Sequence, residues 1–397
     1  MRFTAAREVS AGDLLEPAAS YVSANPMVVA AAAAVVAFLV GIWLVVRWIR
    51  RPMGVRFERL LAKRDEVAVL MHPNPDPDAM ACAIGVEAIA RSVDTDVTIQ
   101  YPGQIRHQEN RAFRTVLDLE FERVASPEDL AADHVILVDH NVPRGFAGAE
   151  QVVPYAVIDH HPGSGTGEAF TDHRTDYGAC ASILAEYCQE LDGVPVGPDG
   201  EPATVDGLAV APEVATGMLY GIQSDTNHLT SGCHHADFAA SAYLFRGVDE
   251  DRLQRIANPQ VSAEVLEIKA RAISSRDVRG SFAVSDVGEI GDADAIPQAA
   301  DELMSLEGVT AVVIYGVRDG TVHFSGRSRD DRVHMGRAME TALAGIHGAT
   351  AGGHARMGGG QAPEKQIAGP HDTESAAGLW SRTELADRLF DAMNGDV

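Results

Sequence analysis

The chain has 397 residues, 46% of them hydrophobic, which is enough for two or three domains with buried cores. Its formal net charge of −25 argues against broad, nonspecific binding of duplex DNA, because phosphate contacts need a basic surface. Only three of the 32 basic residues are lysines; this acidic, lysine-poor composition is typical of a protein from a halophilic archaeon, with an arginine bias from GC-rich coding as the alternative.

An uncharged, apolar run near the N-terminus predicts a membrane span. Residues 27–46 contain no charge, and twenty helical residues are long enough to cross a bilayer. Arg47, Arg50 and Arg51 follow directly, so the positive-inside rule places the rest of the chain in the cytoplasm. The sequence thus predicts a short tail (1–26), a transmembrane helix (27–48) and a connector (49–64). A buried core helix is the alternative.

After the connector, apolar strand patterns alternate with helical patterns, which predicts a mostly parallel sheet covered by helices. This α/β domain is expected over 65–257. Its predicted strands are 67–71, 97–101, 135–139 and 155–159, and its predicted helices are 79–92, 110–117, 179–191 and 212–223. The segment 193–207 has turn residues throughout and is expected to be an exposed loop.

A change of composition near residue 258 marks a second, smaller α+β domain. A charged helical linker (258–277) is expected to lead to this domain (278–397), with an active site in the cleft between the two. The predicted strands are 281–287, 310–317 and 321–326, the predicted helices are 296–306, 335–343 and 382–393, and the glycine-rich stretch 351–360 is expected to be a loop.

Acidic and histidine side chains follow several of the predicted strands. They are His72, Asp76, Asp78, Asp139, Asp159, His160 and His161, and Asp225 follows a predicted helix. In an open α/β sheet the carboxyl ends of the strands form the ligand site. Nitrogen and oxygen ligands without thiolates suit manganese or a similar divalent ion, and about six ligands suffice for two ions. Taken singly, each aspartate could instead be a helix cap or a turn residue.

The segments HPNPDPDA, VDH, DHH and GIQSDTN, in this order, resemble the DHH phosphoesterase family. That family includes RecJ-type exonucleases, oligoribonucleases, cyclic-dinucleotide phosphodiesterases, exopolyphosphatases and family II pyrophosphatases. The resemblance implies that His72 and Asp76 hold one metal ion, and that Asp78, His160 and Asp225 hold a second. Asp139 would bridge both ions, Asp159 would orient its neighbours, and His161 would donate a proton to the leaving group or stabilise it.

The second domain resembles the DHH-associated domain of the nuclease subfamily. The segments GRSR (326–329) and GGH (352–354) match its substrate-binding motifs, and 103–113 matches a substrate-side loop. The resemblance implies that Asn110, Arg327, Ser328, Gly352, Gly353 and His354 bind substrate. One departure is Ala351, where the family usually has a third glycine; its methyl group is expected to narrow the pocket.

These features predict a membrane-anchored phosphodiesterase that needs two divalent ions, manganese in particular. The acidic surface and the short chain favour short nucleotide substrates, such as cyclic di-AMP, its linear product or RNA of a few nucleotides, over extended duplex DNA. A single-strand exonuclease, a pyrophosphatase or exopolyphosphatase, and a non-catalytic membrane receptor for nucleotides are the alternatives. The N-terminal helix is expected to bind the membrane, and a homodimer is possible.

Overall fold

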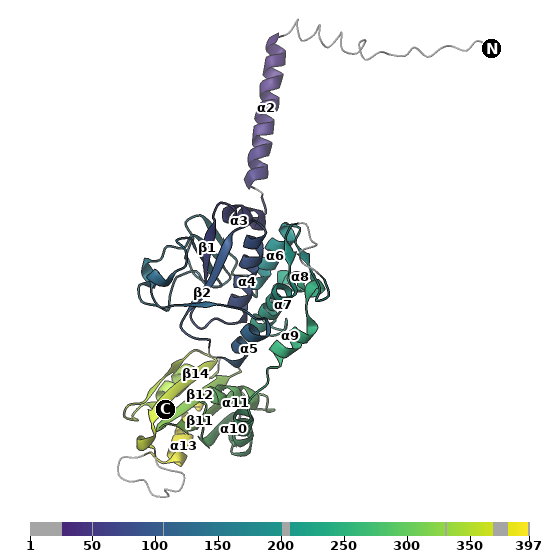
Figure 1. The fold of residues 1–397 in the computed structure, drawn as a ribbon. Coiled ribbons are helices and arrows are strands. Elements are labelled where there is room, and N and C mark those ends of the chain that lie inside the picture. Colours follow the sequence, from purple (N-terminus) through teal and green to yellow (C-terminus); the bar gives the residue numbers. More distant parts are fainter. Residues whose placement is uncertain are drawn as a thin grey trace, which may run out of the picture. The chain divides into compact units, whose positions relative to one another are not determined.

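The computed structural model describes residues 26–49, 51–105, 107–200, 207–329, 332–367 and 380–395. The chain divides into two compact units (Figure 1). The first unit contains residues up to 105 and residues 113–256, and the second contains 106–112 and the chain from 257 onwards. Helix α5 (Gln108–Val116) therefore contributes residues to both units.

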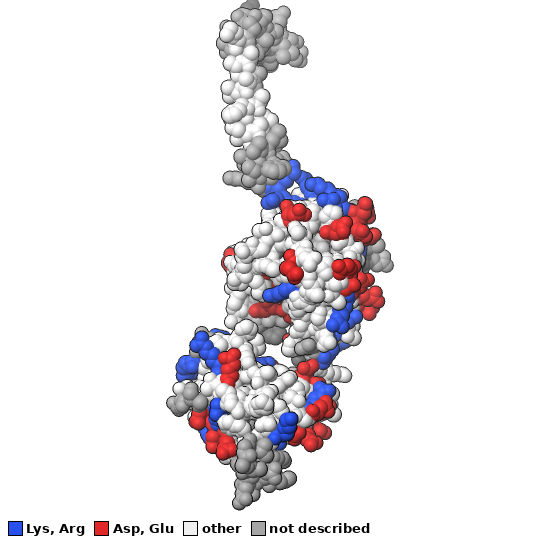
Figure 2. Space-filling model, turned by 90° about the vertical axis from the view of Figure 1, so that its left-hand side faces the viewer, with Lys and Arg blue, Asp and Glu red and all other residues white. Residues whose placement is uncertain are grey.

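Helix α2 (Pro26–Ile49) covers the segment predicted to span a membrane, and α3 (Met53–Leu61) follows it. In the part of the chain that the structure describes, no helix is both long enough and apolar enough to cross a membrane. The prediction of a transmembrane span is therefore not supported. The predicted N-terminal tail lies outside the described residues, apart from Pro26 at the start of α2. Lys and Arg side chains gather near the end of α2 (Figure 2).

The first unit is built on a six-stranded parallel sheet with the order β3-β2-β1-β4-β5-β6. The parallel α/β prediction is thereby confirmed, and the four predicted strands lie within one residue of the observed bounds. The edge strands β3 and β6 were not predicted. The strands are β1 (Glu66–Leu70), β2 (Asp96–Pro102), β3 (Glu122–Val124), β4 (Val135–Val138), β5 (Ala156–Asp159) and β6 (Phe170–His173).

The helices of the first unit pack against one another although they lie far apart in the sequence. Helix α4 packs against both α6 and α7. A Cβ atom on Gly221 of α7 would lie 2.8 Å from the Cβ of Ala81 and 3.2 Å from the Cα of Asp78, so glycine allows the two helices to approach closely here. The helices are α4 (Pro77–Arg91), α6 (Cys180–Glu190), α7 (Pro212–Asp225), α8 (His235–Leu244) and α9 (Glu250–Ala257); β7 (Val194–Pro195) and β8 (Ala209–Val210) form a short pair.

The second unit is a mixed six-stranded sheet with the order β13-β14-β12-β11-β10-β9. Alternate side chains of β11 face two separate cores, one with α12 and α13 and the other with α10 and α11. The strands are β9 (Asp277–Arg279), β10 (Phe282–Glu289), β11 (Ala311–Arg318), β12 (Thr321–Ser328), β13 (Thr350–Gly353) and β14 (Met357–Pro363), and the helices are α10 (Ala263–Ser274), α11 (Ala295–Leu303), α12 (Met335–Leu343) and α13 (Arg382–Asn394).

Two predicted segments of this unit differ from the structure. Helix α10, which was predicted as a linker, buries Val265, Ile268 and Ala272 in the core of the unit. The glycine-rich stretch predicted as a loop contains the hairpin of β13 and β14. Glycine is needed there for packing, because a Cβ on Gly358 would lie 2.9 Å from the carbonyl oxygen of Met335 at the start of α12.

Candidate metal centre

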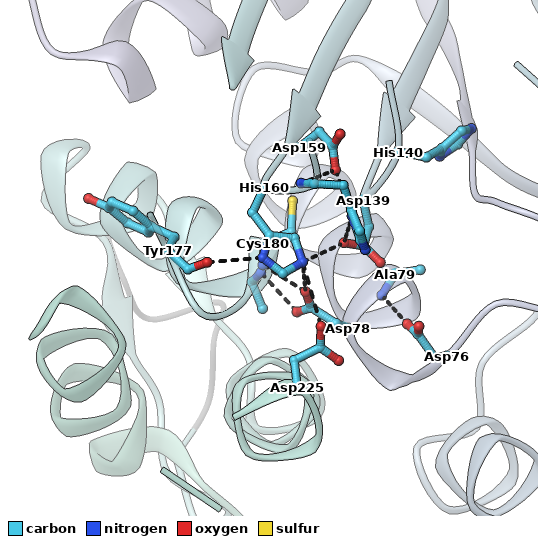
Figure 3. A network of polar contacts seen from close by, with 12 residues as sticks. Asp76, Asp78, Ala79, Asp139, His140, Asp159, His160, Tyr177, Cys180 and Asp225 are labelled. Atoms are coloured by element: carbon cyan, nitrogen blue, oxygen red, sulfur yellow. Dashed lines mark hydrogen bonds and ion pairs between the residues drawn. The ribbon is translucent and has the colours of Figure 1, made fainter. Parts of the chain in front are cut away.

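Three neighbouring strands deliver polar side chains to one edge of the parallel sheet. His72 lies two residues after β1, Asp139 lies directly after β4, and Asp159 is the last residue of β5. The backbone of Asp139 is left-handed (φ 61°), a conformation that aspartate and asparagine adopt more readily than most residues. The turn directs the Asp139 carboxylate back toward the sheet edge, where His160 also lies (Figure 3).

The proline-rich stretch after β1 presents Asp76 and Asp78 in different directions. Asp76 is the N-cap of α4, and its Oδ1 accepts a hydrogen bond of 3.0 Å from the amide of Ala79. Pro77 occupies the first helical position, where its fixed φ suits the helix and its missing N–H costs nothing. Asp78 is the second residue of α4 and is fully buried, whereas the side chain of Asp76 is 40% exposed.

The buried carboxylate of Asp78 is held by the first turn of α6. Its Oδ2 accepts a hydrogen bond of 2.7 Å from the amide of Cys180, and its Oδ1 accepts one of 2.9 Å from the amide of Ala181. Burial, with the charge of Asp139 as a further cause, raises the pKa of Asp78. The helix amides fix the side chain at a position where a nearby cation would favour its charged form.

The six predicted ligands form two groups that share one residue. In the first group, the Nε2 of His72 lies 3.4 Å from Asp76 Oδ2 and 3.5 Å from Asp139 Oδ2. In the second group, the Nε2 of His160 lies 3.3 Å from Asp139 Oδ1, 3.5 Å from Asp225 Oδ2 and 3.9 Å from Asp78 Oδ2. Asp139 therefore offers one oxygen to each group. The ligand atoms in each triad of potential ligands lie within 4.8 Å of one another.

The donor atoms fit divalent cations. Within the described residues, neither oxygen of Asp139 has a hydrogen-bond partner, nor has the Nε2 of His160, although all three atoms are buried. Buried polar atoms are rarely left without a partner. Because these atoms converge from two chain segments and are only carboxylate oxygens and an imidazole nitrogen, the chemistry matches a site for divalent metal ions.

The pKa shifts of the predicted ligands also fit a site for divalent cations. Burial alone would lower the pKa of His72, but the carboxylates of Asp139 and Asp76 outweigh it and raise that pKa to about 10. Burial alone would raise the pKa of Asp139, but His160 and His72 hold that pKa below its usual value. The carboxylates thus create a strongly negative potential at the site. Protons on the histidines balance this charge in the protein alone, and bound cations would balance it instead.

Asp159 contacts His161, the predicted proton donor, which also forms a third triad of potential ligands with Asp139 and His160. Its Oδ1 accepts from the amide of His161 at 3.1 Å and lies 3.0 Å from the Nδ1 of the same residue. Its Oδ2 accepts a hydrogen bond of 2.6 Å from the side chain of Asn141. The hydrogen bond that the Asp159 carboxylate accepts from the ring raises the pKa of His161, whose side chain is 48% exposed. His161 therefore offers an accessible imidazole whose orientation is fixed and whose charged form Asp159 favours.

A polar network behind His160 was missed by the sequence reasoning. The Nδ1 of His160 lies 3.1 Å from the carbonyl oxygen of Tyr177, which leaves the Nε2 for the carboxylates. The phenol of Tyr177 donates to Glu186 at 2.7 Å, and Arg174 contacts Glu186, Tyr177 and Asp172. Partners of this kind orient metal-binding histidines. No sequence motif marks them, because they lie on a loop and a helix that only the fold brings together.

His140 was also left out of the predicted site. It is buried beside His72, with the two rings 6.2 Å apart, and its Nδ1 bonds to the carbonyl oxygen of Val138 at 2.9 Å. Burial lowers the pKa of His140 to about 4, so the ring is neutral at pH 7. It packs beside the ligands without adding charge. The sequence signal that could have placed His140 near the site is its position in the VDH segment.

The predicted substrate residues of the second unit lie on adjoining strands. Arg327 and Ser328 end β12, and Gly352 and Gly353 end β13, with β14 between them. The Nε of Arg327 donates to Asp301 at 2.6 Å, so the guanidinium already has a carboxylate partner. His354 is exposed in the β13–β14 turn, Ser328 is buried, and Asn110 is a buried residue of α5 in the segment 106–112. The methyl group of Ala351 packs against the second unit's core.

We expect Asp78→Asn to destabilise the metal-free protein by about 2–4 kcal/mol, because an amide nitrogen would face a backbone N–H inside the core. Asp76→Asn is the matched control. It should cost less than about 1 kcal/mol, because asparagine is also a good N-cap. Thermal unfolding of both variants in a chelating buffer checks this. Equal melting temperatures would show that the contacts of Asp78 with α6 do not support the fold.

Comparison with known proteins supports the same division of the chain. Residues 66–222 match the model of the DHH family N-terminal domain, and residues 279–372 match that of the DHHA1 domain. The chain carries a DHH domain followed by a DHHA1 domain. The first unit described above contains the matched DHH segment, and the second contains the DHHA1 segment.

The chain is similar to several named proteins. It is 33% identical over 296 residues to protein MJ1633 of Methanocaldococcus jannaschii, covering 74% of this chain and 57% of that protein. It is 28% identical over 319 residues to the cyclic-di-AMP phosphodiesterase GdpP of Geobacillus thermodenitrificans, covering 75% and 46%. The chain thus spans about half the length of these two relatives.

Two further similarities concern pyrophosphatases and the fold. The chain is 25% identical over 334 residues to a "Probable manganese-dependent inorganic pyrophosphatase" of Streptococcus equi subsp. equi, covering 78% of this chain and 98% of that protein. The crystal structure of an exopolyphosphatase-related protein from Bacteroides fragilis matches with a TM-score of 0.57 at 14% identity, covering 86% and 96%. This likeness shows a common fold. The predicted halophilic origin stays a prediction, since none of these similarities bears on it.

Proposed function

We propose that the DHH domain is a metal-dependent phosphodiesterase that hydrolyses short nucleotides. The observation that carries the proposal is the pair of ligand groups that share Asp139, the first with one histidine and two carboxylates and the second with one histidine and three carboxylates. The similarity to a cyclic-di-AMP phosphodiesterase supports a cyclic dinucleotide, its linear product or a short RNA as the substrate. The similarity to a pyrophosphatase named as manganese-dependent supports manganese.

Each ligand group would hold one divalent ion. His72 and Asp76 would bind the first ion, Asp78, His160 and Asp225 would bind the second, and Asp139 would bind both. Two such ions, when bound, activate a water for attack on phosphorus and neutralise charge on the phosphoryl oxygens. The protein residues hold this geometry in advance, because Asp78 is fixed by α6 and His160 by the carbonyl oxygen of Tyr177.

His161 would complete the reaction as the proton donor. Its imidazole is accessible, and the Asp159 carboxylate favours its charged form. A charged imidazole can donate a proton to the leaving oxygen of a phosphodiester. Asp159 keeps the ring orientation fixed through two contacts and is itself held by Asn141. In this scheme Asp159 acts through His161 and touches neither the substrate nor the ions.

A substrate panel separates this function from its closest alternative. The similarity to a pyrophosphatase over nearly that protein's whole length favours inorganic pyrophosphate as a second candidate substrate. Purified full-length chain with manganese should be assayed on cyclic di-AMP, the linear dinucleotide, a long single-stranded DNA and inorganic pyrophosphate. Fastest turnover of a dinucleotide supports the proposal. Fastest turnover of pyrophosphate or of the long strand would replace it with a pyrophosphatase or an exonuclease.

The substrate residues of the DHHA1 domain provide a separate test. We expect Arg327→Ala to raise KM for a dinucleotide by about tenfold to a hundredfold, with a smaller effect on kcat, because a hydrogen bond to a charged group contributes about 1.5–3 kcal/mol. Arg318→Ala, at the far end of the β11–β12 hairpin, is the control. Steady-state kinetics of both variants measures this. A normal KM for Arg327→Ala would remove Arg327 from the proposed substrate site.

The same proposal assigns substrate binding to the other predicted residues of this site: Ser328, Gly352, Gly353, His354 and Asn110. The backbone amides of the glycines and the imidazole of His354 would bind a phosphate or a base. The predicted exclusion of extended duplex DNA and the predicted homodimer remain predictions. A binding assay with duplex DNA tests the first prediction, and the molar mass of the protein in solution tests the second.

A further inference from the structure

A cationic pocket lies beside α3 and includes none of the ligands described above. It is a cavity of about 390 Å³. Figure 2 shows Lys and Arg side chains gathered on one end of the first unit, and the lining of the cavity is rich in them. We call it the cationic pocket; it is lined by Arg51, Arg56, Arg59, Leu60, Lys63, Ala169 and Phe170.

The four cations of this pocket form no ion pair with an acidic side chain in the described part of the chain. Among the described residues, none of Arg51, Arg56, Arg59 and Lys63 has a carboxylate within 4.0 Å, although the chain carries 57 acidic residues. The Nη1 of Arg56 donates to the sulfur of Met53 at 3.1 Å. Four unneutralised positive charges around one cavity repel one another unless an anion lies between them.

The pocket combines charge with an apolar base. Arg56, Arg59 and Lys63 are exposed; Arg56 and Arg59 are three residues apart on one side of α3, and Lys63 lies two residues beyond the end of that helix. Leu60 and Phe170 also line the cavity and are buried, at 8% and 5% exposure. A ligand that fits has an anionic group next to an apolar part, which a free inorganic anion does not have.

The chain directly before the pocket offers a large apolar surface. Every side chain from residue 34 to 42 of α2 is exposed, including Phe38 at 68% and Val36 at 59%. Helix α2 ends at Ile49, and Arg51 already lines the pocket. An exposed apolar surface of this extent marks a site of contact with a membrane or with another protein. An apolar helix next to a group of cations is typical of contact with an anionic lipid surface.

We propose that the cationic pocket binds the phosphate groups of anionic phospholipids at a membrane surface. Arg56, Arg59 and Lys63 would contact the headgroup phosphates, and α2 would contact the acyl region. The proposal concerns the lipid surface and does not require that α2 crosses a bilayer. It is independent of the proposed hydrolase function, because none of these residues contacts the ligand groups of the metal centre.

Vesicle flotation with the full-length chain tests this proposal. Binding is compared between vesicles of phosphatidylcholine alone and vesicles that also contain phosphatidylserine. The test variant is Arg56→Gln/Arg59→Gln/Lys63→Gln. The control is Arg91→Gln/Arg279→Gln/Arg318→Gln, which removes the same number of charges from exposed arginines that have acidic partners. Circular dichroism and turnover confirm that both variants are folded.

We expect phosphatidylserine to increase binding of the wild type and of the control by about tenfold or more. The test variant should lose this increase and keep its binding to neutral vesicles, and high salt should have the same effect on the wild type. Equal binding of the wild type to both kinds of vesicle would overturn the proposal. It would also be overturned if inorganic phosphate stabilised the wild type but not the test variant while phosphatidylserine had no effect, because the site would then bind a free anion.

Discussion

Asp139→Asn is expected to lower kcat for a dinucleotide by about 10³-fold or more, because one carboxylate serves both ligand groups. An amide carries no charge and offers a single oxygen, so it cannot bind two cations from one side chain. The fold should be retained, since asparagine accepts the left-handed backbone of this position. Steady-state kinetics with manganese, together with circular dichroism, measures both effects.

Asp94→Asn is the matched control for this variant. Asp94 has nearly the same left-handed backbone (φ 57°), lies exposed after α4, and is in none of the ligand groups. It should keep full activity. If Asp139→Asn also kept its activity, Asp139 would not be needed for turnover, and the proposed shared ligand would be wrong. A bound nucleotide with no turnover in the wild type would favour the receptor alternative.

Removal of divalent ions is expected to produce the second large effect. A chelator should abolish turnover, and saturating manganese should raise the melting temperature by about 5 °C or more. An ion at a hundred times its Kd stabilises the folded state by about 2.7 kcal/mol, and 1 kcal/mol shifts the melting temperature of a domain of this size by about 2–4 °C. The physical cause is relief of repulsion among Asp76, Asp78, Asp139 and Asp225. Differential scanning calorimetry with and without manganese measures the shift.

Asp139→Asn serves as the control for this measurement too, because it should show a much smaller gain from manganese. Magnesium provides a second comparison, since histidine ligands suit manganese better than magnesium. An equal gain from manganese in the wild type and in the variant would mean that the ions bind elsewhere on this acidic protein.

The sequence could predict which residues meet at the metal centre because parallel strands end at a common edge. His72, Asp139 and His160 follow β1, β4 and β5, which are neighbours in the sheet. Once the βα pattern is recognised, their proximity follows from topology alone. Asp225 was predicted to follow a helix, and it is instead the last residue of α7, which continues for two residues beyond the predicted end.

The sequence could not predict the contacts that hold the ligands in place. The amides of Cys180 and Ala181 bind Asp78 across about a hundred residues of chain, and the carbonyl oxygen of Tyr177 contacts His160. Backbone groups carry no residue signature, so no motif reveals them. Only the packing of α4 against α6 brings them together.

The glycine-rich stretch of the DHHA1 domain was misassigned for a related reason. Local propensity favours a loop for AGGHARMGGG, because glycine weakens strands. Helix α12 packs directly on this hairpin, and a side chain at Gly358 or Gly336 would collide with backbone atoms of the facing segment. Tertiary packing therefore selects glycine within strands, and a single sequence does not distinguish this case from a flexible loop.

The central claim is that two divalent ions share the Asp139 carboxylate, and anomalous diffraction from crystals grown with manganese tests it most directly. The account predicts two anomalous peaks about 3.5–4 Å apart. One peak should contact His72 and Asp76, the other should contact Asp78, His160 and Asp225, and Asp139 should contact both. A single peak, or peaks that do not contact Asp139, would contradict the account.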